Sequence, residues 1–274
     1  MTRRAILIFA SEALVLCFCL APFLYMLATA LSSTGAGYLS PGGHFVPTLG
    51  HFRDILLSPT LHFPRYLLNS VGIALLAALF SVAVASPAAY ALTRMQVRGG
   101  QFLMFAVLSL SMFPPVSLVS SLFQFMTRLG WINTWQALVL PYVAWSMPLA
   151  LWTLVSYFQQ IPTELDRAAL VDGASHFQAM RFILLPVAAP GVFSTGLLAF
   201  IFAFNEFLYA LMLTTDSTAR TMPVAIAMFE GLHGEIPWAE IMAAAAVATA
   251  PVVLLTIAFQ RRIVQGLTKG AVKE

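Results

Sequence analysis

Apolar positions along this chain gather into six long stretches that short polar segments separate. The stretches cover residues 5–31, 67–92, 102–126, 135–158, 187–213 and 239–260. A helix needs about 20 mainly apolar residues to cross the ~30 Å hydrocarbon core of a bilayer, because each residue rises by ~1.5 Å. The pattern therefore predicts an all-α membrane protein in which a single domain contributes six transmembrane helices.

The first stretch also has features of a secretory signal, because Arg3 and Arg4 precede an apolar run that ends in Ala28-Thr29-Ala30. Its apolar length is greater than the ~7–15 residues of a signal peptide's apolar region. We therefore expect a retained membrane anchor rather than a cleaved signal.

Prolines lie inside several stretches: Pro87, the pair Pro114-Pro115, Pro148 and Pro251. Each removes a backbone donor and is expected to kink its helix, which suits a bundle around a pathway. Prolines are also generally commoner in membrane helices than in soluble ones, so a single proline is weak evidence for a pathway.

Composition supports a lipid environment. The 274 residues are 60% hydrophobic and only 9% charged, whereas ordinary soluble domains have roughly 25% charged residues. The net charge of +3 comes from scattered positive residues that form no basic stripe, which argues against a nucleic-acid partner. Cys17 and Cys19 lie two apart in one apolar run, a poor geometry for a disulfide, and are interpreted as small hydrophobic residues.

Positive residues also predict the orientation, because short loops rich in Lys and Arg stay in the cytoplasm. With the N-terminus inside, ten such residues fall on the inner side and four on the outer side. The ten are Arg3, Arg4, Arg94, Arg98, Arg167, Arg181, Arg261, Arg262, Lys269 and Lys273, and the four are Arg53, Arg65, Arg128 and Arg220. Both termini, including a tail at 261–274, are expected in the cytoplasm, and the loop at 32–66, with a short surface helix at 49–57, is expected outside.

The predicted cytoplasmic loop at 163–182 has a helical pattern of its own. Thr163 and Asp166 form an approximate capping box, so a helix is expected to start just after Pro162. Asp172-Gly173 should end that helix. A second amphipathic segment follows over 175–184, before Pro186 opens the next stretch.

Such a loop could lie on the lipid surface as an amphipathic connector, or it could bind another protein. It mixes acidic and basic residues without a Lys-rich face for anionic lipid, and Ala168-Ala169 is a small pair that permits close docking. These two details favour a protein partner.

The loop resembles the cytoplasmic signature of permease subunits of carbohydrate-importing ABC transporters of the maltose and trehalose type. That signature reads Glu-Ala-Ala, two spacers, Asp-Gly-Ala, and later Ile-x-Leu-Pro with a second Pro four residues on. The chain matches it over Ala168-Ala169, Asp172-Gly173-Ala174, Ile183, Leu185-Pro186 and Pro190, and departs from it at Arg167, where the pattern prefers Glu, and at Met180, where it prefers Phe.

The resemblance extends over nearly the whole chain. It includes Leu68-Asn69-Ser70, Met112-Phe113-Pro114, Phe204-Asn205-Glu206-Phe207-Leu208, Pro223-Val224 and the tail from Gln260 to Lys273, which is similar to that of trehalose-importing members. It implies the type I ABC importer permease fold in the inner membrane. It also implies four kinds of partner: a second homologous permease, two ATPase subunits that bind ATP and Mg²⁺, an extracytoplasmic sugar-binding protein and the bilayer. The residues expected to couple to the ATPase are Glu164, Ala168, Ala169, Asp172, Gly173, Ala174, Phe177 and Met180.

A second candidate site is Asn205-Glu206 in the fifth stretch. A charged carboxylate near the bilayer centre costs roughly 2.5–3.5 kcal/mol on insertion scales, so Glu206 needs a partner or a water-filled cavity. Phe204, Phe207 and Tyr209 bracket the pair, and sugars are typically held by hydrogen bonds and aromatic stacking. The pair could line a sugar pathway, or it could bind helices together. Tyr142 and Trp145 are weaker pathway candidates, because aromatic residues also mark membrane interfaces.

Other chemistry has little support in the sequence. There is no Walker lysine motif and no Gly-x-Ser-x-Gly elbow, and the histidines lack metal-ligand spacing. We expect neither an enzyme nor a chain with its own cofactor or metal. The alternatives that stay open are an ion-coupled secondary transporter, for which Glu206 would be the main intramembrane acid, and a permease for a solute other than a sugar.

Overall fold

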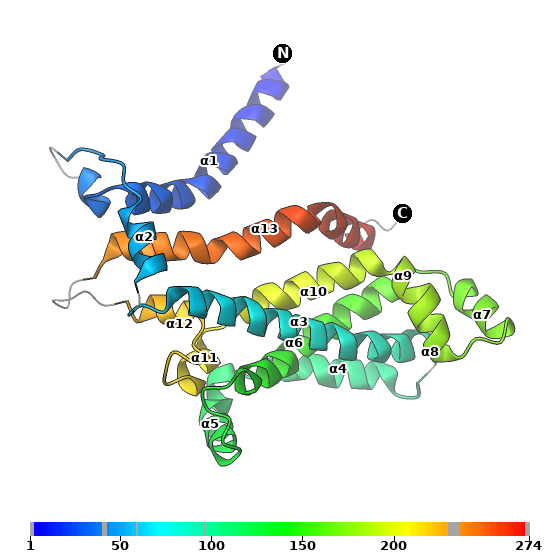
Figure 1. Cartoon of the computed structure of the whole chain (residues 1–274). Helices are drawn as coiled ribbons and strands as arrows, with labels where there is room; N and C mark the ends of the chain where they lie inside the picture. Colours follow the sequence, from blue (N-terminus) through cyan, green and yellow to red (C-terminus); the bar gives the residue numbers. More distant parts are fainter. Residues whose placement is uncertain (1–2, 40–42, 59, 96, 230–235, 272–274) are drawn as a thin grey trace. The chain divides into compact units, whose positions relative to one another are not determined.

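Among the residues described by the computed structural model, every regular element is a helix. These residues are 3–39, 43–58, 60–95, 97–229 and 236–271, and for 3–7, 37, 38 and 261–271 the backbone alone is described. The chain divides into two compact units, Met1–Arg65 with Ala225–Pro251 and Tyr66–Val224 with Val252–Glu274. Figure 1 labels the helices of both units.

The smaller unit contains α1, the first part of α13 and the segment that follows α1. Its elements are α1 (Arg3–Leu31), the 3₁₀ turn η1 (Gly35–Leu39), α2 (Gly50–Leu57) and α13 (Trp238–Ala271), which continues into the larger unit. Helix α2 confirms the short helix predicted at 49–57. Much of α1 is exposed, with Phe18 81% and Leu14 72% accessible, as expected for a helix that faces lipid or another subunit.

His51 fixes α2 to its surroundings within this unit. Its Nδ1 lies 3.2 Å from Glu240 Oε1 on α13, and its Nε2 lies 3.2 Å from the carbonyl oxygen of Ser32. Both ring nitrogens of His51 therefore lie within hydrogen-bond distance of oxygen atoms, which ties α2 to α13 and to the end of α1.

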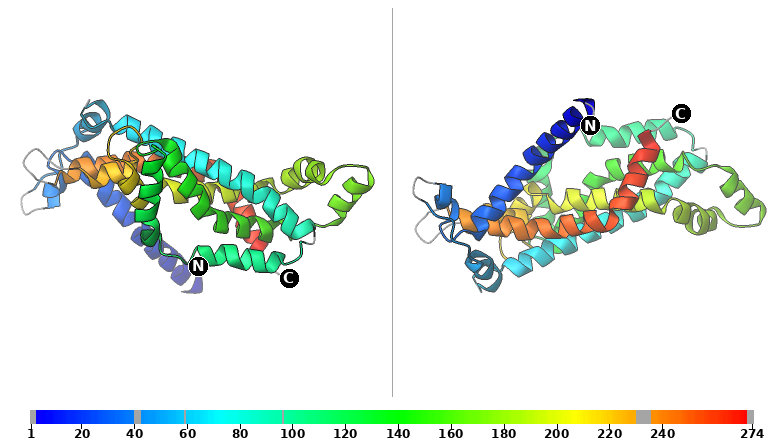
Figure 2. Two further views of the ribbon diagram at one scale, coloured as in Figure 1. Left: turned by 90° about the horizontal axis from the view of Figure 1, so that it is seen from below. Right: turned by 90° about the horizontal axis from the view of Figure 1, so that it is seen from above.

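The larger unit is a helical bundle in which α6 is the most buried of the long helices. Its elements are nearly all of α3 (Phe63–Arg94), α4 (Gly100–Leu110), η2 (Pro115–Leu118), α5 (Val119–Arg128), α6 (Trp135–Phe158), α7 (Glu164–Val171), α8 (His176–Ala179), the π-helical turn η3 (Met180–Leu184), α9 (Leu185–Val187), α10 (Ala189–Phe204), α11 (Leu208–Leu213) and the first half of α12 (Met222–Ala227). Helices α3, α4, α6 and α10 run side by side, and α7 and α8 lie at one end of them in every view (Figures 1 and 2).

Two buried clusters hold this bundle together. One surrounds Tyr142 and Phe200, and the other surrounds Phe158 and Leu184. Polar contacts supplement them, since Ser81 of α3 and Ser146 of α6 share a buried hydrogen bond of 2.6 Å. Hydroxyl pairs of this kind are a usual way to join helices in lipid, where apolar surfaces gain little from meeting one another.

Small residues allow the closest helix contacts. A Cβ atom on Gly191 of α10 would lie 2.4 Å from the ring of Tyr157 on α6, which is inside van der Waals contact. Glycine at this position therefore permits α6 and α10 to pack backbone against ring.

Four helices are long and apolar enough to cross a bilayer: Ile8–Leu31, Phe63–Arg94, Trp135–Phe158 and Trp238–Gln260. Two bent pairs, Gly100–Leu110 with Pro115–Arg128 and His176–Val187 with Ala189–Phe204, would raise the number to six if each is one span. The described residues thus contain four to six spans, and six stays a prediction.

Two of the expected stretches are not single straight helices. At Pro114-Pro115 the third one turns by 85° between α4 and the segment that holds α5. The expected fifth, 187–213, consists of α10, a break after Phe204 and the short α11. By contrast, Pro87, Pro148 and Pro251, where kinks are predicted, lie inside single uninterrupted helices.

Candidate functional site

A cavity of about 490 Å³ opens beside the break between α10 and α11. Its lining comes from α6, from both sides of the break and from the turn after α4: Pro115, Tyr142, Trp145, Ile201, Phe202, Asn205, Glu206, Phe207, Leu208 and Tyr209. The structure therefore brings together Tyr142, Trp145, Asn205, Glu206 and Tyr209, five residues that the sequence singled out.

Glu206 organises the break. Its Oε1 accepts a hydrogen bond from the Tyr209 backbone amide at 2.9 Å, and its Oε2 accepts from the Ala210 amide at 3.1 Å. The hydroxyl of Tyr142 donates to the same Oε2 at 2.7 Å. The carboxylate thus satisfies amides at the start of α11 and joins that helix to α6.

Aromatic rings and one amide form the rest of the polar edge. Trp145 meets Tyr209 edge to face, with ring centroids 6.3 Å apart, and the Tyr209 hydroxyl donates to the Pro115 carbonyl at 3.3 Å. Asn205 is exposed and lines the cavity, its Nδ2 donates to the Ile201 carbonyl at 2.8 Å, and its Oδ1 is a hydrogen-bond acceptor. The cavity offers rings for stacking and an amide for hydrogen bonding.

Phe204 does not line this cavity. Its side chain is 5% exposed and stacks on Phe200, with centroids 5.7 Å apart, in the buried cluster of the bundle. The expectation that Phe204 belongs to the pathway is corrected on this point. Phe207, which the sequence analysis placed beside the pair, does line the cavity. Sequence reasoning had omitted Pro115, Ile201, Phe202 and Leu208, of which the last three lie close to the helix break.

The loop at 163–182 forms the two helices that the sequence predicted. Helix α7 begins at Glu164, directly after Thr163, and ends before Gly173, whose φ of +88° is a left-handed conformation that suits glycine. Helix α8 then begins at His176. The Thr163 side chain makes no cap hydrogen bond to α7, so the capping box predicted there is absent. A capping box is instead present at the start of α8, between Ser175 and Gln178.

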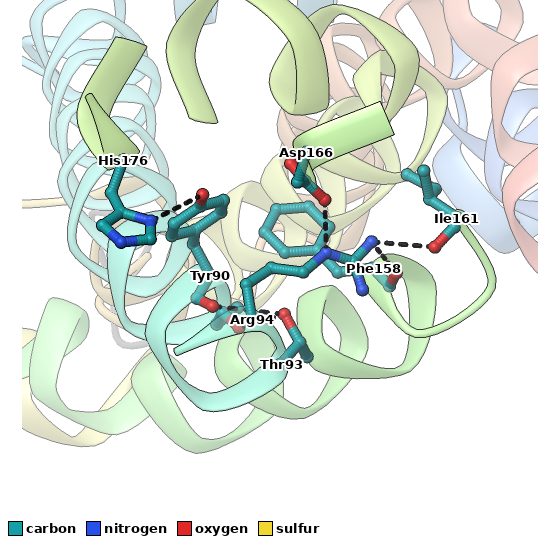
Figure 3. Close-up of polar contacts among 8 residues, drawn as sticks. Tyr90, Thr93, Arg94, Phe158, Ile161, Asp166 and His176 are labelled. Atoms are coloured by element: carbon teal, nitrogen blue, oxygen red, sulfur yellow. Dashed lines mark hydrogen bonds and ion pairs between the residues drawn. The ribbon is translucent and has the colours of Figure 1, made fainter. Parts of the chain in front are cut away.

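Asp166 has a different partner from the one expected. Its Oδ2 accepts from Arg94 Nε at 2.6 Å, and both side chains are almost fully buried. Arg94, on α3, also donates through Nη2 to the carbonyls of Phe158 and Ile161 (Figure 3). Sequence analysis used Arg94 only to predict the orientation, since no local pattern predicts an ion pair across 72 residues.

Most of the residues expected to meet an ATPase are exposed. Glu164, Ala168, Asp172 and Gly173 are accessible, Ala174 is half-buried, and Phe177 is 62% exposed. Ala169 and Met180 are instead buried, at 5% and 6%. These two pack inside the chain's own bundle, so any part they have in docking is indirect. Val171, which is 86% exposed, was not on the expected surface.

A cavity at a broken helix within an apolar helical bundle, with a helical loop at one end of the bundle, fits a transport permease. A family described as binding-protein-dependent transport system inner membrane component matches residues 81–269. The chain belongs to this family, and it is a component of an inner-membrane transport system.

Two relatives match over nearly their whole length. The chain is 49% identical to the trehalose/maltose transport system permease protein MalG of Thermococcus litoralis, covering 98% of this chain and 97% of that protein. It is 40% identical to the trehalose transport system permease protein SugB of Mycobacterium tuberculosis, covering 99% and 98%.

A solved structure shares the fold. It is a bacterial ABC transporter involved in the import of the acidic polysaccharide alginate, which matches with a TM-score of 0.77 over 95% of this chain and 98% of its own at 18% identity. The fold of the chain is therefore that of an ABC importer permease.

Proposed function

We propose that this chain is one permease subunit of an ATP-driven importer for a di- or oligosaccharide, with trehalose and maltose as the first candidates. The observation that carries the proposal is the 49% identity, over 98% of the chain, to a trehalose/maltose permease. The cavity supports it, because aromatic rings and an exposed amide are groups that bind sugars.

The partners follow from the same proposal. A second permease completes the pathway, since six helices enclose little space. Two ATPase subunits hold ATP and Mg²⁺ and hydrolyse ATP in place of this chain, and an extracytoplasmic binding protein delivers the sugar. Both termini and the loop at 163–182 face the cytoplasm.

The ATPase docks on the exposed side of that loop. Val171, Phe177 and Phe182 are 86%, 62% and 67% exposed, respectively, and large apolar side chains at the water-facing end of a bundle favour a protein partner. Closure of the ATPase pair displaces α7 and α8, and the bundle then switches the pathway between inward and outward access.

The substrate assignment is tested by sugar uptake into proteoliposomes that contain the complete importer. Asn205→Ala and Trp145→Ala should each raise the KM for trehalose or maltose several-fold, because they remove an amide and a ring from the cavity edge. Trp152→Ala is the matched control, since Trp152 is an exposed ring on the same helix that lies outside the cavity lining. Uptake driven by membrane potential without ATP would instead support an ion-coupled carrier.

The docking assignment is tested by recovery of the ATPase with the permease. Val171→Glu and Phe177→Glu place charges on the proposed apolar surface and should abolish recovery. Val97→Glu is the control, because Val97 is an exposed apolar residue on a different predicted cytoplasmic loop. Full recovery with both loop variants would overturn the docking proposal.

A further inference from the structure

Helix α3 (Phe63–Arg94) is hydrogen-bonded at both of its ends to segments that are distant in the sequence. Asn69 and Ser70 hold one end, and Arg94 and Tyr90 hold the other. The helix between Asn69 and Arg94 is about 37 Å long at ~1.5 Å per residue. A helix that is hydrogen-bonded to other segments at both ends can transmit a movement of one segment to the other.

At the Arg94 end, α3 holds both helices of the proposed docking loop. Arg94 pairs with Asp166 of α7, and their side chains are 6% and 5% exposed. The Tyr90 hydroxyl lies 3.4 Å from Nδ1 of His176 at the start of α8, with the two rings edge to face (Figure 3). Separating the buried ion pair would leave charges without partners, so α7 and α3 should move together.

The remaining bonds of Arg94 join this end to α6. Its Nη2 donates to the carbonyls of Phe158 and Ile161, at 3.0 and 2.8 Å, where α6 ends. The Phe158 carbonyl lies at the negative end of α6 and also accepts from the Ile161 amide at 3.1 Å, and the Ile161 carbonyl lies just beyond that end, so a guanidinium suits the position in charge. The guanidinium is thus shared by three acceptors in a fixed fork, a geometry that one lysine nitrogen does not reproduce.

At the other end, Asn69 and Ser70 hold the segment between α11 and α12. Asn69 Nδ2 donates to the carbonyls of Thr218 and Arg220, at 3.1 and 3.0 Å, and its Oδ1 accepts from Trp135 Nε1 at 3.1 Å. Ser70 Oγ accepts from the Met222 amide at 2.7 Å. Asn69 and Ser70 are 4% and 2% exposed, so these bonds are protected from water.

The middle of α3 is one continuous helix. Pro87 removes one backbone donor, yet the helix runs unbroken from Phe63 to Arg94. The buried bond between Ser81 and Ser146 joins its central part to α6. We therefore expect α3 to move as a rigid body rather than to bend.

We propose that α3 is a strut that transmits displacement between the docking loop and residues 218–222, with Arg94 and Asn69 as positioning residues at its two ends. The proposal rests on the proposed function, because it needs an ATPase on the loop. It gives the Leu68-Asn69-Ser70 motif a physical role. Coupling between two binding events is reciprocal, so the strut also carries events at the 218–222 end to the ATPase.

The test compares single and double variants in proteoliposomes that contain the partner permease, the ATPase and the binding protein. The readout is the factor by which sugar-loaded binding protein stimulates ATP hydrolysis. Arg94→Met and Asn69→Ala should each reduce this factor several-fold. The double variant should be no worse than the more severe single one, because a break at one end of the strut already removes the part of the stimulation that α3 transmits.

Two controls separate the strut from general damage. Asn133→Gly removes a side chain whose Oδ1 accepts from the amides of Thr215 and Asp216, so it loosens the same segment from outside α3, and glycine tolerates the positive φ there. Its effect should multiply with that of Arg94→Met. Arg98→Met removes an exposed charge near the Arg94 end and should behave as wild type.

A chain with Arg94→Met alone could fail to assemble, because Asp166 would stay buried and charged. Arg94→Met with Asp166→Leu replaces both partners by apolar side chains, which folded proteins often tolerate. This double variant should still be recovered together with the ATPase, and the stimulation of ATP hydrolysis by sugar-loaded binding protein should be lost. Wild-type stimulation in it, or multiplying effects for Arg94→Met and Asn69→Ala, would overturn the strut.

Failure of the proposed function gives a different result. In that case the wild-type complex itself shows no stimulation, or the ATPase is recovered without the apolar surface of Val171 and Phe177. Neither result depends on Arg94 or Asn69, so the two failures can be told apart.

Discussion

Glu206 carries three hydrogen bonds in a region of the chain that is otherwise apolar, and the bond from Tyr142 is the one that a single substitution can remove. Tyr142 is fully buried, and its hydroxyl donates to Glu206 Oε2 at 2.7 Å. Tyr142→Phe should lower the free energy of unfolding by roughly 1.5–3 kcal/mol, the usual range for a hydrogen bond to a charged group. Denaturant titration in detergent measures the loss, with Tyr25→Phe on the exposed face of α1 as the control. An unchanged midpoint for Tyr142→Phe would show that water replaces the lost donor.

Among single residues, the sequence predicted which residue types surround the cavity, but it did not predict which side chains point into the cavity and which point into the core. Asn205 and Glu206 stood out because polar groups in an apolar stretch need partners. Phe204 could not be separated from Phe207 in this way, because both are aromatic neighbours of the pair. Only the break after Phe204 turns one ring into the core and the other toward the opening.

At the scale of elements, helix contacts at glycines give the sharpest expectation. A Cβ atom at Gly191 would lie 2.4 Å from the Tyr157 ring, whereas one at Gly196 would meet Val82 Cγ2 at 3.5 Å, an ordinary contact. Gly191→Ala should therefore separate α6 from α10 and cost about 1–3 kcal/mol of stability, as overpacking does. Gly196→Ala on the same helix should be neutral or slightly stabilising, because alanine favours a helix over glycine. Thermal unfolding of both variants in detergent makes the comparison, and equal midpoints would contradict the close contact.

Element boundaries show what a local pattern can and cannot predict. The start of α7 and the turn at Gly173 follow from neighbouring residues, and the structure confirms both. The Thr163 cap was wrong because Asp166 takes part in a tertiary ion pair with Arg94 instead. The 85° turn at Pro114-Pro115 agrees with the kink that the two prolines predict, whereas hydropathy alone does not indicate it, since residues on both sides of the turn are apolar.

At the scale of the whole molecule, the orientation in the membrane still depends on the count of positive residues. It predicts that the loop holding Arg167 faces the cytoplasm and that the segment holding Thr60 faces outward. The side chains of both residues are exposed, so cysteines placed there should react with reagents that reach them. The native Cys17 and Cys19 are also exposed and must first be replaced by alanine.

In that background, Thr60→Cys should be labelled by a membrane-impermeant maleimide in intact cells, and Arg167→Cys only after the membrane is permeabilised. Labelling of denatured protein is the control for the presence of each cysteine. The reverse pattern would place the docking loop outside the cell, where no ATP-hydrolysing partner could reach it. The proposed strut needs an ATPase on the docking loop. The reverse labelling pattern would therefore also remove the physical basis of the strut.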